Sequence, residues 1–568
     1  MKALRRVVLF GISLLTMPGM AQSQTSDSAW ERIVDRYFDE AVFRYTPSAA
    51  TTNGFHEWDA KLEDLSHAAI QQRIEVLHRF EREVSDFRSQ APDRDLVLGD
   101  IHANLLALES IRMWEKNPDA YSSAASNGAF VIMSRKFASV DSRLVSLIAR
   151  EKQMPKLFTA ARDNLKNPPR VYTEVAIEQL PDIIAFFQND VPLAFKDVSS
   201  AQLRGQFVQS NAAVVEELKS YLAWLKSDLL PRSNGDFRLG ADNYRKKLLY
   251  DELVDIPLDK LLKIGLEDLR RNQQRLRDTA KKIDPNKTPR QILDEAEKNH
   301  PAPDKLLPAF RDTLDGLRNY IAARRLATIP SQVLPIVEET PPFMRALTSA
   351  SMDMPGPYEK VAKEAFFNVT LPDKGLNARD VEEYMQGFNR GVIVSTAIHE
   401  AYPGHYLQGL WLERAPSKAR KLIGANTYME GWAHYCEQMM LDEGYGNGDL
   451  KLRLGQLQDA LLRNARYVVG IEMHTGKMTF DQAVEFFVKE GFQTRSNAVK
   501  ETKRGTSDPT YLYYTLGKLE ILKLREDYRK ARGAAFTLEE FHNKFLSQGM
   551  PPIKIVRRAM LGNDSPVL

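Results

Sequence analysis

The chain has 568 residues, of which 43% are hydrophobic and 27% are charged, and it contains a single cysteine. This composition excludes a disordered chain, because a chain of this length and hydrophobicity can bury a large core. One cysteine forms neither an intramolecular disulfide nor a thiolate metal cluster, which excludes zinc fingers, iron–sulfur proteins and disulfide scaffolds. The 78 basic residues exceed the 75 acidic ones by three, and residues 1–21 hold three basic residues and no acid. The rest of the chain is therefore balanced, and its net charge does not predict a nucleic-acid or membrane partner.

The first residues of the chain have the pattern of an export signal. Lys2, Arg5 and Arg6 form a basic start, and the apolar residues 7–17 follow. This stretch is much shorter than the roughly 20 apolar residues that cross a bilayer, and no cysteine for lipid attachment follows it. We therefore expect residues 1–23 to be a cleaved signal peptide. The mature protein is expected to be soluble and either periplasmic or secreted, with no membrane segment.

Downstream of the signal, the hydrophobic pattern is mostly helical. Between residues 258 and 283, apolar side chains recur at helical spacing, and most Arg and Lys residues lie off that stripe. The sequences that start at Thr288, Thr479 and Thr537 fit the capping box, in which a Thr is followed three residues later by Glu or Gln. These signals predict one helix over residues 258–283 and three more that begin at the threonines.

Strand signals are few and lie in the middle of the chain. Residues 333–338 and 365–371 are short, rich in β-branched or aromatic side chains, and close to prolines. No internal repeat and no Gly/Ser linker interrupts the helical pattern. We therefore expect a mostly α fold with a small β element, built as one large helical domain over residues 24–568. A rise in proline density places a candidate lobe boundary near residues 325–345.

The first residues with clear chemistry are His399 and Glu400, which follow the apolar residues 391–398. A His-Glu pair on a buried helix is how the H-E-x-x-H motif of zinc metallopeptidases begins. In that motif two histidines bind the metal and the glutamate activates a water molecule. The pair therefore predicts a metal centre on a buried helix.

The second histidine of the motif is displaced. His405 lies six positions after His399 rather than four, and on an ideal helix the two side chains would point about 120° apart. Pro403 cannot continue a helix, and Gly404 permits an unusual backbone. We therefore expect a break at these two residues that returns His405 to the metal.

A second cluster follows on one predicted helical face, with Glu430, His434 and Glu437 at positions i, i+4 and i+7. Glu430 is the candidate third metal ligand. Thr427 and Glu430 also fit a capping box, which would leave Glu430 with a structural role. His434 is a candidate either for orienting a ligand or substrate, or for a plain core position.

Four segments of the chain form a distinctive set: PSAATTNGFHEWDAKLEDLS at 47–66, HEAYPGHYLQ at 399–408, EGWAHYCE at 430–437 and YTLGKLEILKLR at 514–525. Together they resemble one bacterial family, the domain of unknown function 885. The resemblance covers most of the mature chain and implies a mostly helical, zinc-dependent metallopeptidase of the gluzincin kind, with one Zn²⁺ per chain. The strand signals at 333–338 and 365–371 place the small β element near this active site.

The resemblance also implies roles for single residues. His399 and His405 match the motif histidines that bind the metal, and Glu430 matches the acid of the E-G-W-A motif. Glu400 matches the catalytic glutamate, and Tyr514 matches a tyrosine three residues before a Gly-Lys pair. Tyr511 and Arg504 are candidates for substrate binding, although the proline that precedes these tyrosines is spaced differently from the family pattern.

These roles fit metal-assisted hydrolysis. Three protein ligands leave one metal position open for water, Glu400 would accept the proton of that water, and Tyr514 would stabilise the oxyanion.

Free peptide ends need charged partners. Arg504 and Arg525 are candidates for a C-terminal carboxylate, and Glu437 and Asp508 are candidates for an N-terminal amine. The predicted strand over residues 365–371 could pair, as an edge strand, with an extended peptide.

We therefore expect an exported zinc metallopeptidase that acts on short peptides. One alternative is a zinc amidohydrolase with a non-peptide amide substrate. A second is a helical di-metal protein that uses Glu400, His405, Glu430, His434 and Glu437 as ligands. A third is a non-catalytic binding protein, although binding alone would not need Glu400. The sequence leaves the oligomeric state, the physiological substrate and the choice between endopeptidase and exopeptidase open.

Overall fold

The computed structural model describes residues 29–88, 93–341, 344–345 and 348–568. The predicted signal peptide over residues 1–23 lies outside this part of the chain. The described residues are mostly α-helical with one small sheet, which confirms the predicted fold class. No helix among them is long and apolar enough to span a bilayer. The predicted lobe boundary near residues 325–345 stays a prediction.

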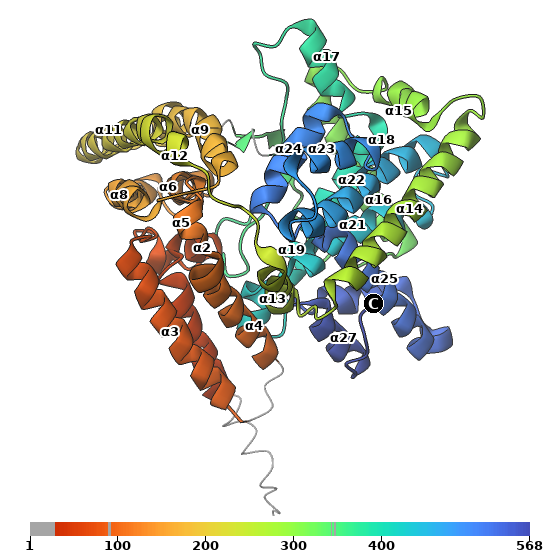
Figure 1. Cartoon of the computed structure of the whole chain (residues 1–568), viewed down its shortest axis with the longest axis horizontal. Helices are drawn as coiled ribbons and strands as arrows, with labels where there is room; N and C mark the ends of the chain where they lie inside the picture. Colours follow the sequence, from red (N-terminus) through yellow and green to blue (C-terminus); the bar gives the residue numbers. More distant parts are fainter. Residues whose placement is uncertain (1–28, 89–92, 342–343, 346–347) are drawn as a thin grey trace, which may run out of the picture.

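The N-terminal half forms a group of helices on one side of the molecule, drawn from red to yellow in Figure 1. Their apolar side chains make two large buried clusters, and several of these helices begin at a serine whose hydroxyl accepts a hydrogen bond from the first turn. Besides a helix over residues 29–37, the α-helices of this half include α2 (Pro47–Thr52), α3 (His67–Asp86), α4 (Arg94–Leu105), α5 (Met113–Lys116), α6 (Asp119–Ser134), α7 (Val140–Glu151), α8 (Met154–Asn164), α9 (Arg170–Ala185), α10 (Val191–Ala194), α11 (Ala201–Trp224) and α12 (Leu230–Arg232).

The C-terminal half, drawn from yellow-green to blue in Figure 1, carries the His-Glu motif and the other candidate site residues. Its α-helices are α13 (Gly240–Glu252), α14 (Leu258–Ile283), α15 (Pro289–Glu297), α16 (Leu306–Arg324), α17 (Ala378–Gln386), α18 (Arg390–Glu400), α19 (His405–Leu412), α20 (Lys418–Leu422), α21 (Asn426–Asp442), α22 (Leu450–His474), α23 (Phe480–Lys489), α24 (Arg495–Ser507), α25 (Tyr513–Arg532), α26 (Leu538–Leu546) and α27 (Ile553–Leu561). The predicted helix over 258–283 is therefore confirmed as α14. Thr288 and Thr479 form complete capping boxes, whereas only the threonine side of the box forms at Thr537.

The small sheet has the strand order β1-β3-β2. β1 (Ile336–Glu339) runs parallel to β3 (Phe366–Val369), and β2 (Ala350–Asp353) runs antiparallel to β3. Both predicted strands are present, but β3 lies in the centre of the sheet. The prediction that residues 365–371 form an edge strand is therefore wrong. The edges are β1 and β2, and the Ala-Ser-Met-Asp sequence of β2 has little strand propensity.

Two glycine contacts bring the motif helices close together. A Cβ atom on Gly391 of α18 would lie 3.1 Å from Cα of Gly455 on α22. A Cβ atom on Gly431 of α21 would lie 2.6 Å from Cα of Gly517 on α25. Only glycines allow backbones to approach so closely. These crossings place α18, α21, α22 and α25 around a common centre.

The N-terminal half also packs against the segment that follows β2. Nε2 of His56 lies 3.0 Å from Oε2 of Glu359, and the backbone N–H of Tyr358 donates to the carbonyl of Asn53 at 3.1 Å. A Cβ atom on Gly356 would lie 2.3 Å from Cα of Asn53, so the two backbones touch. The segment over residues 354–359 is therefore held by the N-terminal helices.

Candidate metal centre

The two motif histidines lie on either side of a break between α18 and α19. α18 ends at Glu400, and α19 begins at His405. The backbone N–H of Gly404 donates to the carbonyl of Ile398 at 2.9 Å and folds the segment back onto α18. A Cβ atom on Gly404 would lie 1.8 Å from the carbonyl oxygen of His399, so only glycine fits there. The predicted break is therefore present, and it brings the rings of His399 and His405 edge to face with centroids 4.9 Å apart.

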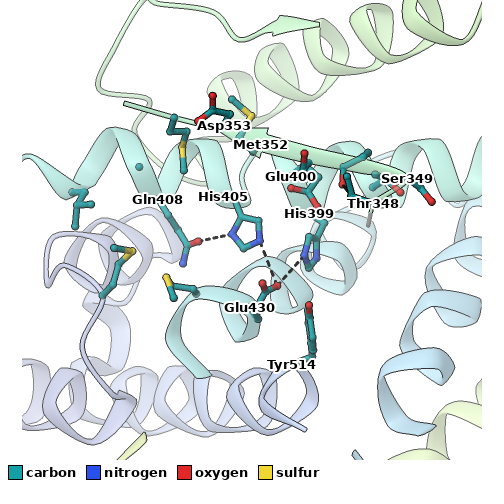
Figure 2. A pocket seen from close by; sticks show the side chains of 18 of the residues that line it. Thr348, Ser349, Met352, Asp353, His399, Glu400, His405, Gln408, Glu430 and Tyr514 are labelled. Atoms are coloured by element: carbon teal, nitrogen blue, oxygen red, sulfur yellow. Dashed lines mark hydrogen bonds and ion pairs between the residues drawn. The ribbon is translucent and has the colours of Figure 1, made fainter. Parts of the chain in front are cut away.

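Glu430 on α21 faces both imidazoles (Figure 2). Its Oε2 atom lies 3.2 Å from Nε2 of His399 and 3.4 Å from Nε2 of His405. Two ligands at about 2.0–2.1 Å from a tetrahedral zinc ion are themselves about 3.3–3.4 Å apart. The spacing of these donor atoms therefore fits a metal site with two histidines and one glutamate.

Hydrogen bonds hold the far side of each imidazole. Nδ1 of His399 lies 2.7 Å from Oε1 of Glu437, and Nδ1 of His405 lies 3.0 Å from Oε1 of Gln408. An acceptor at Nδ1 fixes the proton on that nitrogen and leaves Nε2 to bind a metal. Both rings are thus oriented with Nε2 toward Glu430.

Glu437 is the centre of a buried network behind His399. Its side chain is fully buried. Oε1 lies 2.9 Å from Nη2 of Arg463, and Oε2 lies 3.0 Å from Nδ1 of His434. Because its oxygens already bind three partners, Glu437 is not available to a substrate amine, contrary to the prediction.

The N-terminus of α21 is capped from another part of the chain. Glu252 of α13 accepts hydrogen bonds from the backbone N–H groups of Asn426 at 3.1 Å and Thr427 at 2.9 Å, and from the Thr427 hydroxyl at 2.6 Å. Thr427 thus lies inside the helix and does not act as its cap. The capping-box interpretation of Glu430 is therefore wrong, and its carboxylate is free to face the histidines.

These donor atoms line a cavity of about 700 Å³. Glu400 lines it beside the histidines, and its carboxylate forms with them a group of candidate ligand atoms that lie within 4.8 Å of one another. β2 and its flanking residues, from Thr348 to Pro357, form another wall (Figure 2). The cavity therefore combines the candidate metal ligands, a further carboxylate and the edge of a sheet.

Tyr514 lies in the same cavity. Its ring is stacked near that of His399, with centroids 6.2 Å apart, and its hydroxyl accepts a hydrogen bond from Nη2 of Arg504 at 3.2 Å. The guanidinium groups of Arg463, Arg466 and Arg504 all lie within 4.9–5.9 Å of the Tyr514 ring. The predicted residues Tyr514 and Arg504 are thus brought to the candidate metal centre.

Comparison with known proteins identifies the family. The profile of the bacterial proteins of unknown function named DUF885 matches residues 47–560. The chain belongs to the DUF885 family. No curated protein matches the chain.

Two solved structures resemble this DUF885 protein along almost their whole length. One is a candidate lipoprotein of unknown function from Shewanella oneidensis, which is 27% identical, covers 95% of this chain and 99% of its own, and has a TM-score of 0.77. The other is a candidate lipoprotein from Colwellia psychrerythraea, which is 18% identical, covers 94% of this chain and 98% of its own, and has a TM-score of 0.78. The second comparison supports the fold alone.

Burial and neighbouring charges separate the two carboxylates of this DUF885 centre. Burial acts to raise the pKa of Glu430, but the charge of His405 and the hydrogen bonds from both histidines hold that pKa well below its ordinary value. Burial raises the pKa of Glu400, and the histidines oppose this only in part. Burial lowers the pKa of His399, but its hydrogen bonds to Glu430 and Glu437 outweigh this and raise it to about 9. Glu430 is therefore suited to hold a cation, and Glu400 is suited to exchange a proton.

Two predicted residues lie behind the cavity or away from it. His434 is fully buried and bonded to Glu437, and burial lowers its pKa to about 3. It therefore orients the partner of His399 rather than contacting substrate. Tyr511 does not line the cavity, contrary to its assignment to substrate binding, because its ring fills the space above Gly470 and Gly505.

The other candidates for binding peptide ends also lie outside the cavity. Arg525 donates to the hydroxyl of Tyr435 at 3.0 Å. Asp508 accepts hydrogen bonds from Arg504 and from the hydroxyl of Tyr513. Of the four candidates, only Arg504 lines the cavity.

Four residues of the site are absent from the sequence-based prediction. Asp459, Arg463 and Arg466 come from α22 and line the cavity. They belong to no motif, but three ionisable side chains within a helix whose other faces are largely buried are a signal that could have been noticed. The fourth is Trp432 of the E-G-W-A segment, whose Nε1–H donates to the carbonyl of Pro403 at 2.8 Å and ties α21 to the break between the histidines.

Proposed function

We propose that this protein is an exported, zinc-dependent metallohydrolase that cleaves peptide bonds in short peptides. The observation that carries the proposal is the convergence of Nε2 of His399 and Nε2 of His405 on one oxygen of Glu430, at 3.2 and 3.4 Å. Imidazole and carboxylate donors are the ligands typical of catalytic zinc sites with three protein ligands. Glu400 in the same cavity adds the carboxylate that hydrolysis needs.

The residues of the chain would divide the work of hydrolysis. A zinc ion held by His399, His405 and Glu430 would supply a Lewis acid that lowers the pKa of water and polarises a carbonyl group. Glu400 would accept a proton from the attacking water and pass it to the leaving amine. The hydroxyl of Tyr514 would donate a hydrogen bond to the oxyanion that develops on the substrate.

The shape of the cavity supports an extended peptide as substrate. β2 lies at the edge of the sheet and pairs with β3 on one side only. Its residues line the cavity that contains Glu400. An exposed strand edge offers backbone N–H and C=O groups to an extended peptide, as in other cases of strand addition. A cavity of about 700 Å³ suits a short peptide rather than a folded protein.

Export is supported from two sides. Residues 1–23 have the pattern of a cleaved signal peptide, and the similar structures from Shewanella oneidensis and Colwellia psychrerythraea are described as candidate lipoproteins. The single cysteine of this chain, Cys436, is buried in α21. The proposed export route of this chain therefore involves no lipid on a cysteine.

The di-metal alternative has less support. Its additional ligands would be His434 and Glu437, which are fully buried and hydrogen-bonded to each other outside the cavity. A zinc amidohydrolase would use the same ligands and the same proton acceptor. Trials with peptide and non-peptide amides separate that alternative from a peptidase.

Metal content and turnover test the proposal together. We expect one zinc per chain in the wild type and none in His405→Ala, measured by mass spectrometry of the metal. His78→Ala, on the surface of α3, is the matched control and should retain zinc. Glu400→Gln should retain zinc and lose peptide hydrolysis. Zinc that persists without His405 contradicts the ligand assignment, and full activity of Glu400→Gln contradicts the hydrolytic mechanism.

A further inference from the structure

Three guanidinium groups line the cavity around Tyr514, of which Arg463 is tied to Glu437 behind His399 and the other two are not. Arg466 of α22 and Arg504 of α24 both line the cavity, and their Cζ atoms lie 4.9 and 5.9 Å from the centre of the Tyr514 ring. The carboxylates that pair with them, Glu501 and Asp508, do not line the cavity. The positive charge is therefore presented to the cavity, and the negative charge lies behind it.

Each guanidinium is held by one edge only. Arg466 donates through Nε and Nη2 to Glu501 at 2.7 and 2.9 Å. Arg504 donates through Nε and Nη2 to Asp508 at 3.3 and 3.1 Å. Neither Nη1 group has a hydrogen bond to a residue in the described part of the chain. The Arg466 side chain is only 9% exposed, and a carboxylate with two oxygens would satisfy such a pair of donors.

The distance from these guanidinium groups to His399 limits the number of substrate residues that fit between them. The Tyr514 ring lies 6.2 Å from the His399 ring and 5.9 Å from Cζ of Arg504. The guanidinium is thus at most about 12 Å from His399, which is the length of three to four extended residues. Arg504 also forms part of the wall of a neighbouring cavity between α9 and α24.

We propose that Arg466 and Arg504 bind the free C-terminal carboxylate of the substrate, so that the protein removes a few residues from the C-terminal end of peptides. This inference rests on the proposed hydrolase function. In each turnover one water is consumed: the C–N bond breaks, the hydroxyl joins the carbonyl carbon, and a proton passes to the amine. The released fragment keeps the anchored carboxylate and leaves with it.

The test uses pairs of N-acetylated pentapeptides that end either in a free carboxylate or in a carboxamide. We expect kcat/KM of the zinc-loaded wild type to be about 100-fold higher for the free acid. Arg504→Met should lose most of that preference, so that kcat/KM of this variant for the free acid falls to nearly its own value for the carboxamide. Arg504→Lys should restore part of the preference. Arg495→Met, an exposed arginine on the same helix, is the matched control.

Binding gives a readout that does not depend on turnover. Calorimetry on the Glu400→Gln protein should show tighter binding of the free acid than of the carboxamide, and Arg504→Met should remove the difference. Equal affinity for both peptides, or an equal loss for both in Arg504→Met, overturns the carboxylate anchor and leaves the hydrolase proposal standing. If the wild type cleaves neither peptide, the proposed hydrolase function is wrong. The binding affinities for the free acid and the carboxamide would then still test whether Arg466 and Arg504 bind the C-terminal carboxylate.

Discussion

The imidazole of His399 is fixed at both of its nitrogen atoms. Nδ1 lies 2.7 Å from Glu437, and Nε2 lies 3.2 Å from Glu430. Arg463 approaches Glu437 at 2.9 Å and so balances the buried charge of this carboxylate. A buried, paired carboxylate behind a ligand histidine orients the ring and increases its basicity. The role of Glu437 is therefore to hold His399 rather than to bind substrate.

Glu437→Gln tests this positioning role. The amide keeps the shape of the side chain but cannot accept hydrogen bonds with both of its terminal atoms. We expect zinc affinity to fall by about 10–100-fold, measured by competition with a chromophoric chelator. Asp442→Asn, at the exposed end of the same helix, should leave the affinity unchanged. An unchanged affinity in Glu437→Gln would show that His399 is oriented by packing alone.

At the scale of elements, the site depends on where helices cross. α21 and α25 meet at Gly431 and Gly517, and this crossing places Glu430 beside Tyr514. The two glycines belong to the two motifs that also supply these functional side chains. Glycine is needed at these positions because the backbones of α21 and α25 lie so close together. A Cβ atom on Gly517 would lie 1.9 Å from the carbonyl oxygen of Thr427.

Gly517→Ala should separate the two helices. We expect the free energy of unfolding to fall by about 1–3 kcal/mol, as for other overpacked cores, together with a loss of zinc affinity. Gly205 of α11 has open space around its Cα atom, so Gly205→Ala should instead stabilise the protein by about 0.5–1 kcal/mol. Denaturant unfolding measures both. A neutral effect of Gly517→Ala would contradict the close crossing.

Glu252 links the pH dependence of stability to the cap of α21. Burial raises its pKa from 4.5 to about 7, although hydrogen bonds from Thr427 oppose this. In the unfolded chain the carboxyl ionises near its ordinary pKa, whereas in the folded chain it ionises only near pH 7. Its contribution to stability is therefore fully present below about pH 4.5 and is lost as the pH rises to 7, by up to about 3 kcal/mol.

Glu252→Gln removes this ionisation. Between pH 5 and pH 8, chelator-treated wild type should lose more stability than the variant, by up to about 3 kcal/mol. The measurement is denaturant unfolding at the two pH values. Glu267→Gln, on the exposed face of α14, should follow the wild type. Parallel pH profiles for the wild type and Glu252→Gln would mean that Glu252 is already ionised in the folded protein at pH 5.

At the scale of the whole molecule, the candidate ligands join three helices of the C-terminal core. α18, α19 and α21 contribute His399, His405 and Glu430, and their apolar faces belong to one buried cluster. An ion that binds only the folded arrangement stabilises the whole of it, by about 4 kcal/mol at a free concentration 1,000 times Kd.

Chelation should therefore lower the midpoint of thermal unfolding. We expect calorimetry to show a lower midpoint for chelator-treated wild type and its recovery when zinc is added back. The His405→Ala variant should give the same midpoint with and without chelator. If the chelator changes neither protein, no structural or catalytic metal is bound at this centre.

Features that depend on neighbouring residues could be predicted from the sequence, whereas features that depend on contacts between distant segments could not. The helical period places α14 at the bounds that the structure has, and Pro403 with Gly404 predicts the break that brings His405 back. β2 could not be predicted, because a weak Ala-Ser-Met-Asp strand forms only by pairing with β3. Arg466 lines the cavity because α22 packs against α18, where Gly455 contacts Gly391. This contact joins two separate segments, so neither segment alone predicts it.

The contact between the N-terminal helices and the segment after β2 sets an order of assembly. Asn53, Gly356 and Pro357 all line the cavity, and His56 and Glu359, which join the two segments, are 303 positions apart in sequence. Contacts over such separations form late in folding, because a long loop must close first. A chain in transit across a membrane would therefore carry the metal ligands without a finished cavity. For the proposed hydrolase, peptide cleavage would begin only when the N-terminal helices have packed against the segment after β2.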